Sequence, residues 1–477
     1  MLHQVIREHL DPFLRTAAEA SEGRGLPQFV EREFRDFLMC GLFEQGVARF
    51  RCEGCAHEHL VPFSCKGRGF CPSCGGRRMT ERAAHLVDAV LPQVPVRQWV
   101  LTVPYRLRYA MAWDHGLSRA VLGVYARVLL DAYARGAHER GVHDGRTGTL
   151  TAIQRAGSGL QLNVHFHTLA LDGVFSEARP GALEFHPAPA PSDAEVAEVL
   201  ATVRRRVQRL LERRGLEPSV DESGRVDPLA EESPVLAGIA SASVQGRVAL
   251  GPRAGARVQR VGRDPDAEAV TSRGPRQAQL EGFDLHANVW VHGNDRAGLE
   301  RLCRYVLRPP LAQDHLRLRS DGRVAVELKR AWRDGTMELM FEPLEFLEKL
   351  AAITPRPQVN LIICHGLLAP RARSRPDVVA YGRIVPDPPS AAAGGAGLAS
   401  LPDGVGTPHS PRYWRWAELM HRAFELDVLA CPRCGGRLRF IGTVHDPGVI
   451  QRLLAHLGRP RSGQNPGPAP PGPIVPP

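Results

Sequence analysis

Lysine is nearly absent from this chain, although the chain is basic. Only Lys66, Lys329 and Lys349 are lysines among its 61 lysine and arginine residues, and the net charge is +10. A basic surface suits a polyanionic partner, and the planar guanidinium fork of arginine suits phosphate. Arginine-rich codon usage in a GC-rich genome explains the same composition. The charge therefore supports a nucleic-acid partner without establishing one.

Long apolar runs are also missing. No stretch approaches the roughly 18 apolar residues of a membrane span, and the opening segment MLHQVIREHLDPFL has no h-region and no cleavage site. We therefore expect a cytoplasmic protein with no membrane partner. Its ten cysteines are, in a reducing compartment, more typical of metal ligands or buried thiols than of disulfides.

What is present is a mixture of helical and strand patterns, without an internal repeat, in a chain of 477 residues that is 43% hydrophobic. This length and composition predict about two to four domains with a sizeable core. The apolar spacing predicts helices at 27–40, 77–94, 115–136, 192–214 and 294–308. It predicts strands at 98–104, 149–156, 162–171, 283–292, 322–329, 336–341 and 358–364.

Composition shifts divide the chain into five parts. We expect a helical and zinc-binding part at 1–94, a catalytic part at 95–385, a Pro/Gly/Ala/Ser-rich linker at 386–410, a C-terminal segment at 411–458 and a disordered Pro-rich tail at 459–477. Within the second part, residues 216–280 are polar, and we expect an insertion or loops there.

Four cysteines near the N-terminus form two CxxC pairs. Cys52, Cys55, Cys71 and Cys74 have the spacing of a tetrahedral four-thiolate zinc site, which is structural because it leaves no open position. Cys65, His57 or His59 could replace one of these ligands. The block also carries Arg68, Arg77 and Arg78. These arginines either contact DNA or are simply exposed to solvent around a zinc site that only stabilises the fold.

A single CxxC pair recurs near the C-terminus, at Cys431 and Cys434. Half a zinc site cannot hold zinc tightly alone, so His421, His445 or another chain would have to complete it. Otherwise the pair is two inert thiols.

Two histidines alternate in the predicted strand 162–171. His165 and His167 point to one side of a sheet and Phe166 to the other, where it can enter a core. Two imidazoles on one face can hold a divalent metal. Two nearby histidines in a strand are often incidental, so the surrounding residues decide whether this pair is a metal site.

A third ligand can come from a neighbouring strand. With a two-residue turn at Ser158-Gly159, position 154 opposes 163, and Gln154 lies diagonal to His165 on the metal face, beside Asn163. A three-residue loop would remove Gln154 from that face. His286 and Asn288, which alternate on another predicted strand, are the competing ligands.

Tyr305 lies near the end of the predicted helix 294–308, among Arg301, Arg304 and Arg308. A tyrosine on a buried helix face is usually part of the core. Cations around a phenol would, however, favour phenolate and hold a phosphate. A metal on the two histidines would polarise the same phosphate, and the parts together would form a phosphodiester transesterification centre.

Several segments, in order over about residues 25–450, now support a specific resemblance. They are CKGRGFCPSC, QWVLTVPYRLRY, QRAGSGLQLNVHFHTLALDGVF, ASVQGRVALGPRAG, LERLCRYVLRPPLA, CHGLLAPRAR and WAELMHRAFELDVLACPRCGGRLR. The chain resembles rolling-circle transposases of the insertion sequence 91 family, within the HUH (histidine-hydrophobic-histidine) endonuclease superfamily.

The resemblance implies a fold and a mechanism. The implied fold class is α+β, with an antiparallel-sheet HUH nuclease core flanked by helices, a small N-terminal zinc-ribbon-like domain and a short C-terminal tail domain. His165 and His167 are expected to bind Mg²⁺ or Mn²⁺. Tyr305 is expected to attack single-stranded DNA at the transposon end, forming a 5′-phosphotyrosine bond, and to rejoin strands at target DNA. The zinc block is expected to bind DNA.

The chain departs from part of the family at one position. Some members carry a second tyrosine four residues earlier on the helix, where this chain has Arg301. It thus resembles the single-tyrosine branch linked to common-region elements. In this chain Tyr305 would have to be reused, or a second protomer of a homodimer would have to supply the second nucleophile. The alternatives are a plasmid replication initiator or relaxase with the same centre, and a non-catalytic zinc-containing DNA-binding protein.

Overall fold

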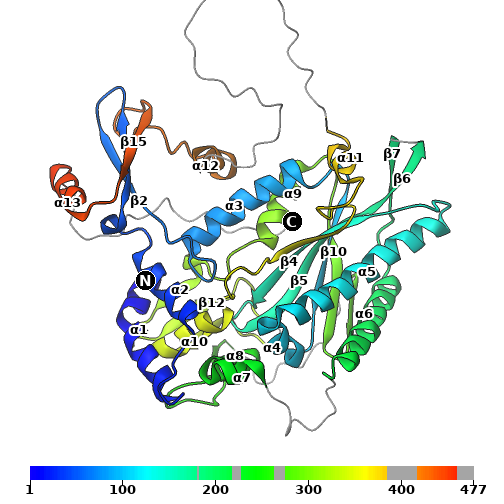
Figure 1. The fold of residues 1–477 in the computed structure, drawn as a ribbon, viewed down its shortest axis with the longest axis horizontal. Coiled ribbons are helices and arrows are strands. Elements are labelled where there is room, and N and C mark those ends of the chain that lie inside the picture. The colour runs from blue at the N-terminus through cyan, green and yellow to red at the C-terminus, as the bar shows by residue number, and fades with distance from the viewer. Residues whose placement is uncertain (180–181, 217–226, 263–273, 333, 384–415, 459–477) are drawn as a thin grey trace, which may run out of the picture.

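A six-stranded antiparallel sheet forms the centre of the computed structural model, which describes residues 1–179, 182–216, 227–262, 274–332, 334–383 and 416–458 (Figure 1). Its strand order is β14-β4-β5-β3-β10-β9. The strands are β3 (Val96–Thr102), β4 (Gly148–Ala156), β5 (Leu162–Leu171), β9 (Gln277–Leu280), β10 (Phe283–Val291) and β14 (Ile362–Gly366). The expected α+β class is confirmed.

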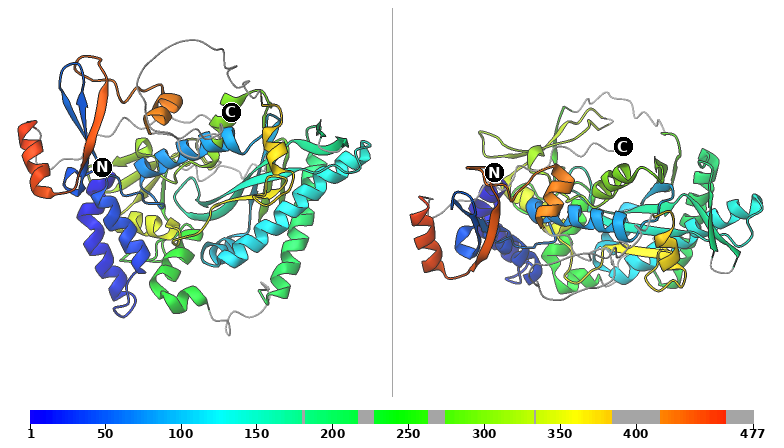
Figure 2. Two further views of the ribbon diagram at one scale, coloured as in Figure 1. Left: turned by 45° about the horizontal axis from the view of Figure 1, so that its top comes forward. Right: turned by 90° about the horizontal axis from the view of Figure 1, so that it is seen from above.

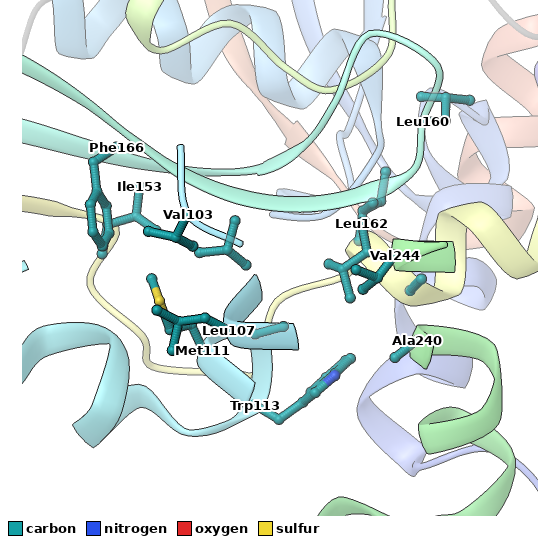
Figure 3. Close-up of a cluster of buried hydrophobic side chains, with 14 of the residues drawn as sticks. Val103, Leu107, Met111, Trp113, Ile153, Leu160, Leu162, Phe166, Ala240 and Val244 are labelled. Carbon is teal, nitrogen blue, oxygen red and sulfur yellow. The ribbon is translucent and has the colours of Figure 1, made fainter. Parts of the chain in front are cut away.

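One face of this sheet packs on the main hydrophobic core. Phe166 of β5 is fully buried there, and its ring stacks on that of Tyr125 with centroids 6.2 Å apart. Figure 3 shows Phe166 above Met111 and Leu107, as expected from the alternation of the strand. Most helical residues of this core come from α1 (Leu2–Glu19), α2 (Gln28–Met39), α4 (Tyr105–Trp113), α5 (His115–Glu139), α6 (Asp193–Arg213), α8 (Pro234–Val244) and α10 (Pro343–Ile353).

The opposite face carries α3 (Pro72–Ala89) and α9 (Arg296–Val306), which lie side by side in Figure 1. Leu150 and Leu169 of the sheet pack with Leu302 and Val306 of α9 in a second buried cluster. Because residues two apart on a strand share a face, His165 and His167 lie on this same side as Leu169. The sheet thus presents the histidine pair to the helix that carries Tyr305.

A buried ion pair joins β3 to the residue that follows β5. Arg97 of β3 donates from Nε and Nη2 to the two carboxylate oxygens of Asp172, at 2.9 and 2.8 Å. The Tyr133 hydroxyl of α5 donates to the same carboxylate at 2.8 Å. Buried charges require such complete pairing, so this network ties α5 to the end of β5.

The β4–β5 hairpin differs from the expected two-residue turn. A loop closed by the Gly157 amide, which donates to the Gln161 carbonyl, and a bulge after Gln154 shift the pairing. Gln154 directly opposes His165, rather than Asn163. The shift is two positions along the strand, so Gln154 keeps the expected face.

The expectation of loops over 216–280 is wrong for the part that the structure describes. This region contains α7 (Pro228–Glu232), α8, β8 (Gln259–Val261) and β9. Leu236, Ile239 and Ala240 of α8 are buried, and α8 packs on α10 and β5. The small residues of α8 carry little apolar periodicity, which is why the sequence pattern missed it.

Residues 416–458 do not form a separate unit. They comprise α12 (Trp416–Phe424), β15 (Leu438–Val444) and α13 (Pro447–His456), and β15 pairs with β1 (Val47–Cys52), which pairs with β2 (Glu58–Pro62). The expected linker at 386–410 and tail at 459–477 lie outside the described residues. The remaining domain boundaries stay predictions.

Two smaller sheets complete the fold. One has the order β11-β12-β13-β8 and the other pairs β6 with β7. Their further elements are β6 (Gly173–Arg179), β7 (Ala182–Pro187), β11 (Leu316–Leu318), β12 (Val324–Glu327) and β13 (Glu338–Phe341), with a short helix α11 (Arg375–Ala380) after β14. Among the described helices, none is sufficiently long and apolar to cross a membrane.

Truncating the buried ring of β5 tests this packing. Phe166→Ala should lower the free energy of unfolding by about 3–5 kcal/mol, because it removes a fully buried aromatic side chain and leaves a cavity. Denaturant unfolding measures the change. Met337→Ala, at a side chain that is 57% exposed, is the control and should change stability by less than about 0.5 kcal/mol. Equal effects of the two substitutions would contradict the assignment of Phe166 to the core.

Candidate active site and metal centres

The histidine pair lies in a buried environment. His165 and His167 are 8% and 4% exposed, and their ring centroids are 4.9 Å apart. Burial lowers the pKa of His165 to about 4 and holds the pKa of His167 well below its ordinary value. Both imidazoles are therefore neutral at pH 7, which is the form that binds metals.

The hydrogen bonds of the pair leave one nitrogen of each ring for a ligand. His165 Nδ1 donates to the Asn163 carbonyl at 2.8 Å, and the Gln98 amide lies 2.8 Å from His167 Nδ1. Because a carboxamide can present either its oxygen or its nitrogen, this contact accommodates an Nδ1 proton on His167. Among the described residues, the buried His167 Nε2 has no hydrogen-bond partner. An orphaned buried nitrogen is what a metal site lacking its ion presents.

The residues that could supply a third metal ligand lie at different distances from His165 and His167. Gln154 is on β4, next to β5, and its Nε2 donates to the Val306 carbonyl of α9 at 2.6 Å, which leaves its Oε1 for a ligand. His286 shares the face, but β10 is two strands away from β5, or about 10 Å. Asn288 is exposed, and its side chain accepts from Arg276. Gln154 is therefore better placed than His286.

Tyr305 lies against the histidine pair. Its ring centroid is 6.0 Å from that of His167, at an interplanar angle of 81°. The Arg308 guanidinium lies 4.2 Å from the Tyr305 ring centroid. The structure thus brings together His165 and His167 of β5, Tyr305 of α9 and Arg308, which follows α9. They are two imidazoles, a potential nucleophile and a cation, from segments far apart in the sequence.

Lys329 is a further residue near this site that the sequence analysis did not assign. Burial lowers the pKa of Lys329, the charge of Arg308 lowers it further, and the phenol of Tyr305 raises it. Lys329 is therefore close enough to Tyr305 for their charges to interact. The rarity of lysine does not distinguish Lys329 from Lys66 and Lys349, so no sequence signal identified it.

The other candidate arginines have structural partners. Arg304 donates to the Ala423 carbonyl of α12 at 3.2 Å, and Arg78 donates to the carbonyls of Gly67 and Lys66 at 3.0 and 2.9 Å. Arg68 donates to the Val359 carbonyl. Arg77 lies on α3. Their expected contact with DNA stays a prediction, and Arg304 in addition holds two helices together.

The N-terminal cysteines do not form the expected single site. Cys71 and Cys74, at the start of α3, instead lie with Cys40 and Cys65, and all four sulfur atoms are within 4.8 Å of one another. Cys40 follows α2 and has no CxxC partner, so local spacing could not reveal it. The backbone amides of Cys65 and Gly67 donate to Sγ of Cys40 and Cys65 at 3.4 and 3.3 Å, as in thiolate metal sites.

Cys52 and Cys55 form a second cluster with Cys431 and Cys434, and these four sulfur atoms are also within 4.8 Å of one another. The expected set of Cys52, Cys55, Cys71 and Cys74 is therefore wrong. Cys71 and Cys74 close with Cys65, which was named as a possible replacement ligand, and with the distant Cys40, whereas Cys52 and Cys55 close with Cys431 and Cys434. In the described part of the chain, no metal-ligating cluster includes His57, His59, His421 or His445.

Comparisons with known families agree with this geometry. A family model described as "Putative transposase" matches residues 148–375, and one described as "Transposase zinc-binding domain", of the insertion sequence 91 type, matches residues 5–103. No curated protein and no solved structure matches the chain.

The first match covers β4, β5 and α9, and the second covers the cluster of Cys40, Cys65, Cys71 and Cys74. The fold and the cysteine clusters, read with these matches, define a zinc-binding transposase, an enzyme that cleaves DNA during transposition. The chain belongs to the insertion sequence 91 family of transposases.

Burial of neutral imidazoles makes stability depend on pH. The folded pKa of His165 is about 4, below its ordinary value of 6.5, so the unfolded chain binds the proton first as pH falls. The contribution of His165 to the free energy of unfolding should be fully present above pH 6.5. It should fall by about 3 kcal/mol as the pH is lowered from 6.5 to 4. Unfolding measured across this range, without added divalent metal, should show a smaller fall in His165→Gln. His138→Gln, at an exposed histidine, should retain the slope; an unchanged slope in His165→Gln would contradict the burial of a neutral ring.

Proposed function

We propose that this transposase nicks and rejoins single-stranded DNA with Tyr305 as its nucleophile, in rolling-circle-like transposition. The observation that carries the proposal is the contact of the Tyr305 ring with the buried, neutral His167, on one face of the sheet. A phosphodiester transfer needs a nucleophile, a group that withdraws charge from the phosphate, and cations that hold it. Tyr305 would be the nucleophile, a metal held by His165 and His167 would withdraw charge, and Arg308 would help to hold the phosphate.

Two cations lie near Tyr305. Arg308 lies over the ring, and Lys329 is close enough to interact with the phenol. Both cations attract a phosphate, which would hold the scissile group beside the tyrosine oxygen. Gln154 holds the last turn of α9 through the Val306 carbonyl, which positions Tyr305 relative to the histidines.

His165 and His167 would hold the catalytic Mg²⁺ or Mn²⁺ through their Nε2 atoms, with Gln154 Oε1 as the third ligand. The hydrogen bonds at both Nδ1 atoms and the unpartnered Nε2 of His167 fit this role. A divalent ion bound there would polarise the scissile phosphate.

The proposed reaction conserves the number of phosphodiester bonds. Tyr305 Oη loses its proton to solvent or a nearby base and attacks phosphorus, the bond from phosphorus to the 3′ oxygen breaks, and that oxygen takes up a proton as a 3′-hydroxyl. The product is a 5′-phosphotyrosine bond, and attack on it by a 3′-hydroxyl of target DNA reverses the chemistry. No external energy source is needed.

A single tyrosine must serve both strand transfers. The position one turn before Tyr305 is Arg301, which is half exposed and lies 3.9 Å from Asp295. A second transfer would then use Tyr305 again or the tyrosine of a second copy in a homodimer. The protein would act in the bacterial cytoplasm, at the nucleoid, where both DNA substrates are.

Removing the hydroxyl of Tyr305 tests the nucleophile. A labelled single strand carrying the transposon end, incubated with the protein and Mn²⁺, should yield a covalent protein–DNA adduct on denaturing gels. Tyr305→Phe should reduce the adduct by roughly a thousandfold or more, because no other group replaces the attacking oxygen.

Tyr381→Phe is the matched control, since Tyr381 is half-buried on the same side of the sheet and its hydroxyl accepts only a backbone amide from Phe185 in the described contacts. It should form the adduct at the wild-type level. An adduct that persists in Tyr305→Phe would overturn the assignment, and DNA binding without any adduct would favour a non-catalytic DNA-binding protein.

Gln98 tests the metal site from outside the ligand set. Gln98→Ala should weaken Mn²⁺ binding by about 10–100-fold, because His167 loses the partner that orients its ring. Gln98→Glu keeps an acceptor for the Nδ1 proton and should bind Mn²⁺ within a few-fold of wild type. Calorimetric titration with MnCl₂ measures both. Wild-type affinity in Gln98→Ala would show that the pair does not hold the metal in this way.

A further inference from the structure

The second cysteine cluster joins the two ends of the chain. Cys52 ends β1 and Cys55 lies in the turn between β1 and β2, whereas Cys431 and Cys434 belong to the segment between α12 and β15. The sulfur atoms of Cys52 and Cys434 are 3.5 Å apart, and those of Cys55 and Cys431 are 3.7 Å apart. Cys431 and Cys434 lie outside both segments that match the family models.

These distances fit a tetrahedral metal rather than disulfides. With zinc–sulfur bonds of about 2.3 Å, thiolates at the corners of a tetrahedron lie about 3.8 Å apart, whereas a disulfide bond is about 2.05 Å long. The first cluster has similar spacings, such as 3.8 Å between Cys40 and Cys74. Four thiolates without an oxygen ligand select a soft ion such as zinc.

The backbone around the second cluster has the form of two facing knuckles. The Gly435 amide donates to the Cys431 carbonyl, and Gly435 has a φ of +72°, which favours glycine. The Gly436 amide donates to Cys434 Sγ at 3.4 Å. A Cβ on Gly436 would lie 3.2 Å from Cys434 Sγ and 3.3 Å from Cys52 Sγ, so the glycines permit the close approach of the two turns.

We propose that Cys52, Cys55, Cys431 and Cys434 bind a second structural zinc ion that ties the C-terminal segment to the N-terminal zinc-binding domain. On either side of this site the segment is held by different contacts. After it, β15 pairs with β1 through Cys52 and Leu438. Before it, α12 lies against α3 in both views of Figure 2.

The position of α12 connects this zinc site to the helix that carries Tyr305. Arg422 of α12 donates to Asp88 of α3 and to Glu300 of α9, with distances from 2.6 to 2.9 Å. Arg304, adjacent to Tyr305, donates to the Ala423 carbonyl. The zinc ion therefore anchors the chain just beyond α12, and loss of the ion should loosen α12 on α9.

Zinc content of the full-length protein tests the site directly. Elemental analysis after dialysis should find two zinc ions per wild-type chain and one in the double variant Cys431→Ser/Cys434→Ser. Cys364→Ser, at a cysteine outside both clusters, should retain two. A single zinc ion in the wild type, two in the double variant, or a disulfide among the four cysteines by mass spectrometry would each overturn the proposal.

Hydrogen exchange tests the link to α12. The double variant should exchange amides of residues 417–424 and β15 roughly tenfold faster than wild type, because a local contact has been released. Cys434→His, which replaces one thiolate by an imidazole at an exposed position, should keep two zinc ions and slow exchange. Zinc loss with unchanged exchange in α12 would overturn the anchoring role. These measurements do not depend on Tyr305 as nucleophile, so the two proposals fail separately.

Discussion

The two-residue period of strand β5 is the constraint on which the rest of the site depends. Phe166 enters the core between α4 and α5, and this orientation places His165 and His167 on the opposite face, beneath α9. A slip of one residue would turn the imidazoles into the main hydrophobic core and the phenyl ring toward α9 and Tyr305. Burial of the Phe166 ring therefore sets the direction of both histidines. The same packing stabilises the fold and fixes the geometry of the site.

The neutral imidazoles and the cations occupy different parts of the site. The imidazoles are buried and neutral, whereas Arg308 and Lys329 lie on the side of Tyr305. Burial keeps each imidazole neutral, so one nitrogen of each ring has a lone pair that can bind a cation. Nearby cations would oppose that binding if no anion were present, so in the proposed reaction the metal and the DNA phosphate would bind together.

The cysteines show how tertiary structure reorganises a motif. The spacing of the CxxC pairs suggests that neighbours in sequence share one zinc ion, and the prediction followed that spacing. In the structure each N-terminal pair closes with partners from elsewhere, Cys40 and Cys65 for one and Cys431 and Cys434 for the other. Pairing across the chain connects α2 to α3 and β1 to β15. A metal cluster that joins distant segments adds more to stability than one that closes a short loop, because it restricts more of the unfolded chain.

The sequence by itself determined the local features. It predicted the strands at the centre of the sheet, the helix at 192–214 that corresponds to α6, the direction of Phe166 and the family of the chain. These follow from hydrophobic period and motif, which are properties of neighbouring residues. Only the tertiary structure decided that Gln154 opposes His165, that Lys329 approaches Tyr305, and which cysteines meet. Such contacts depend on loop geometry and on packing between distant segments, which no local pattern encodes.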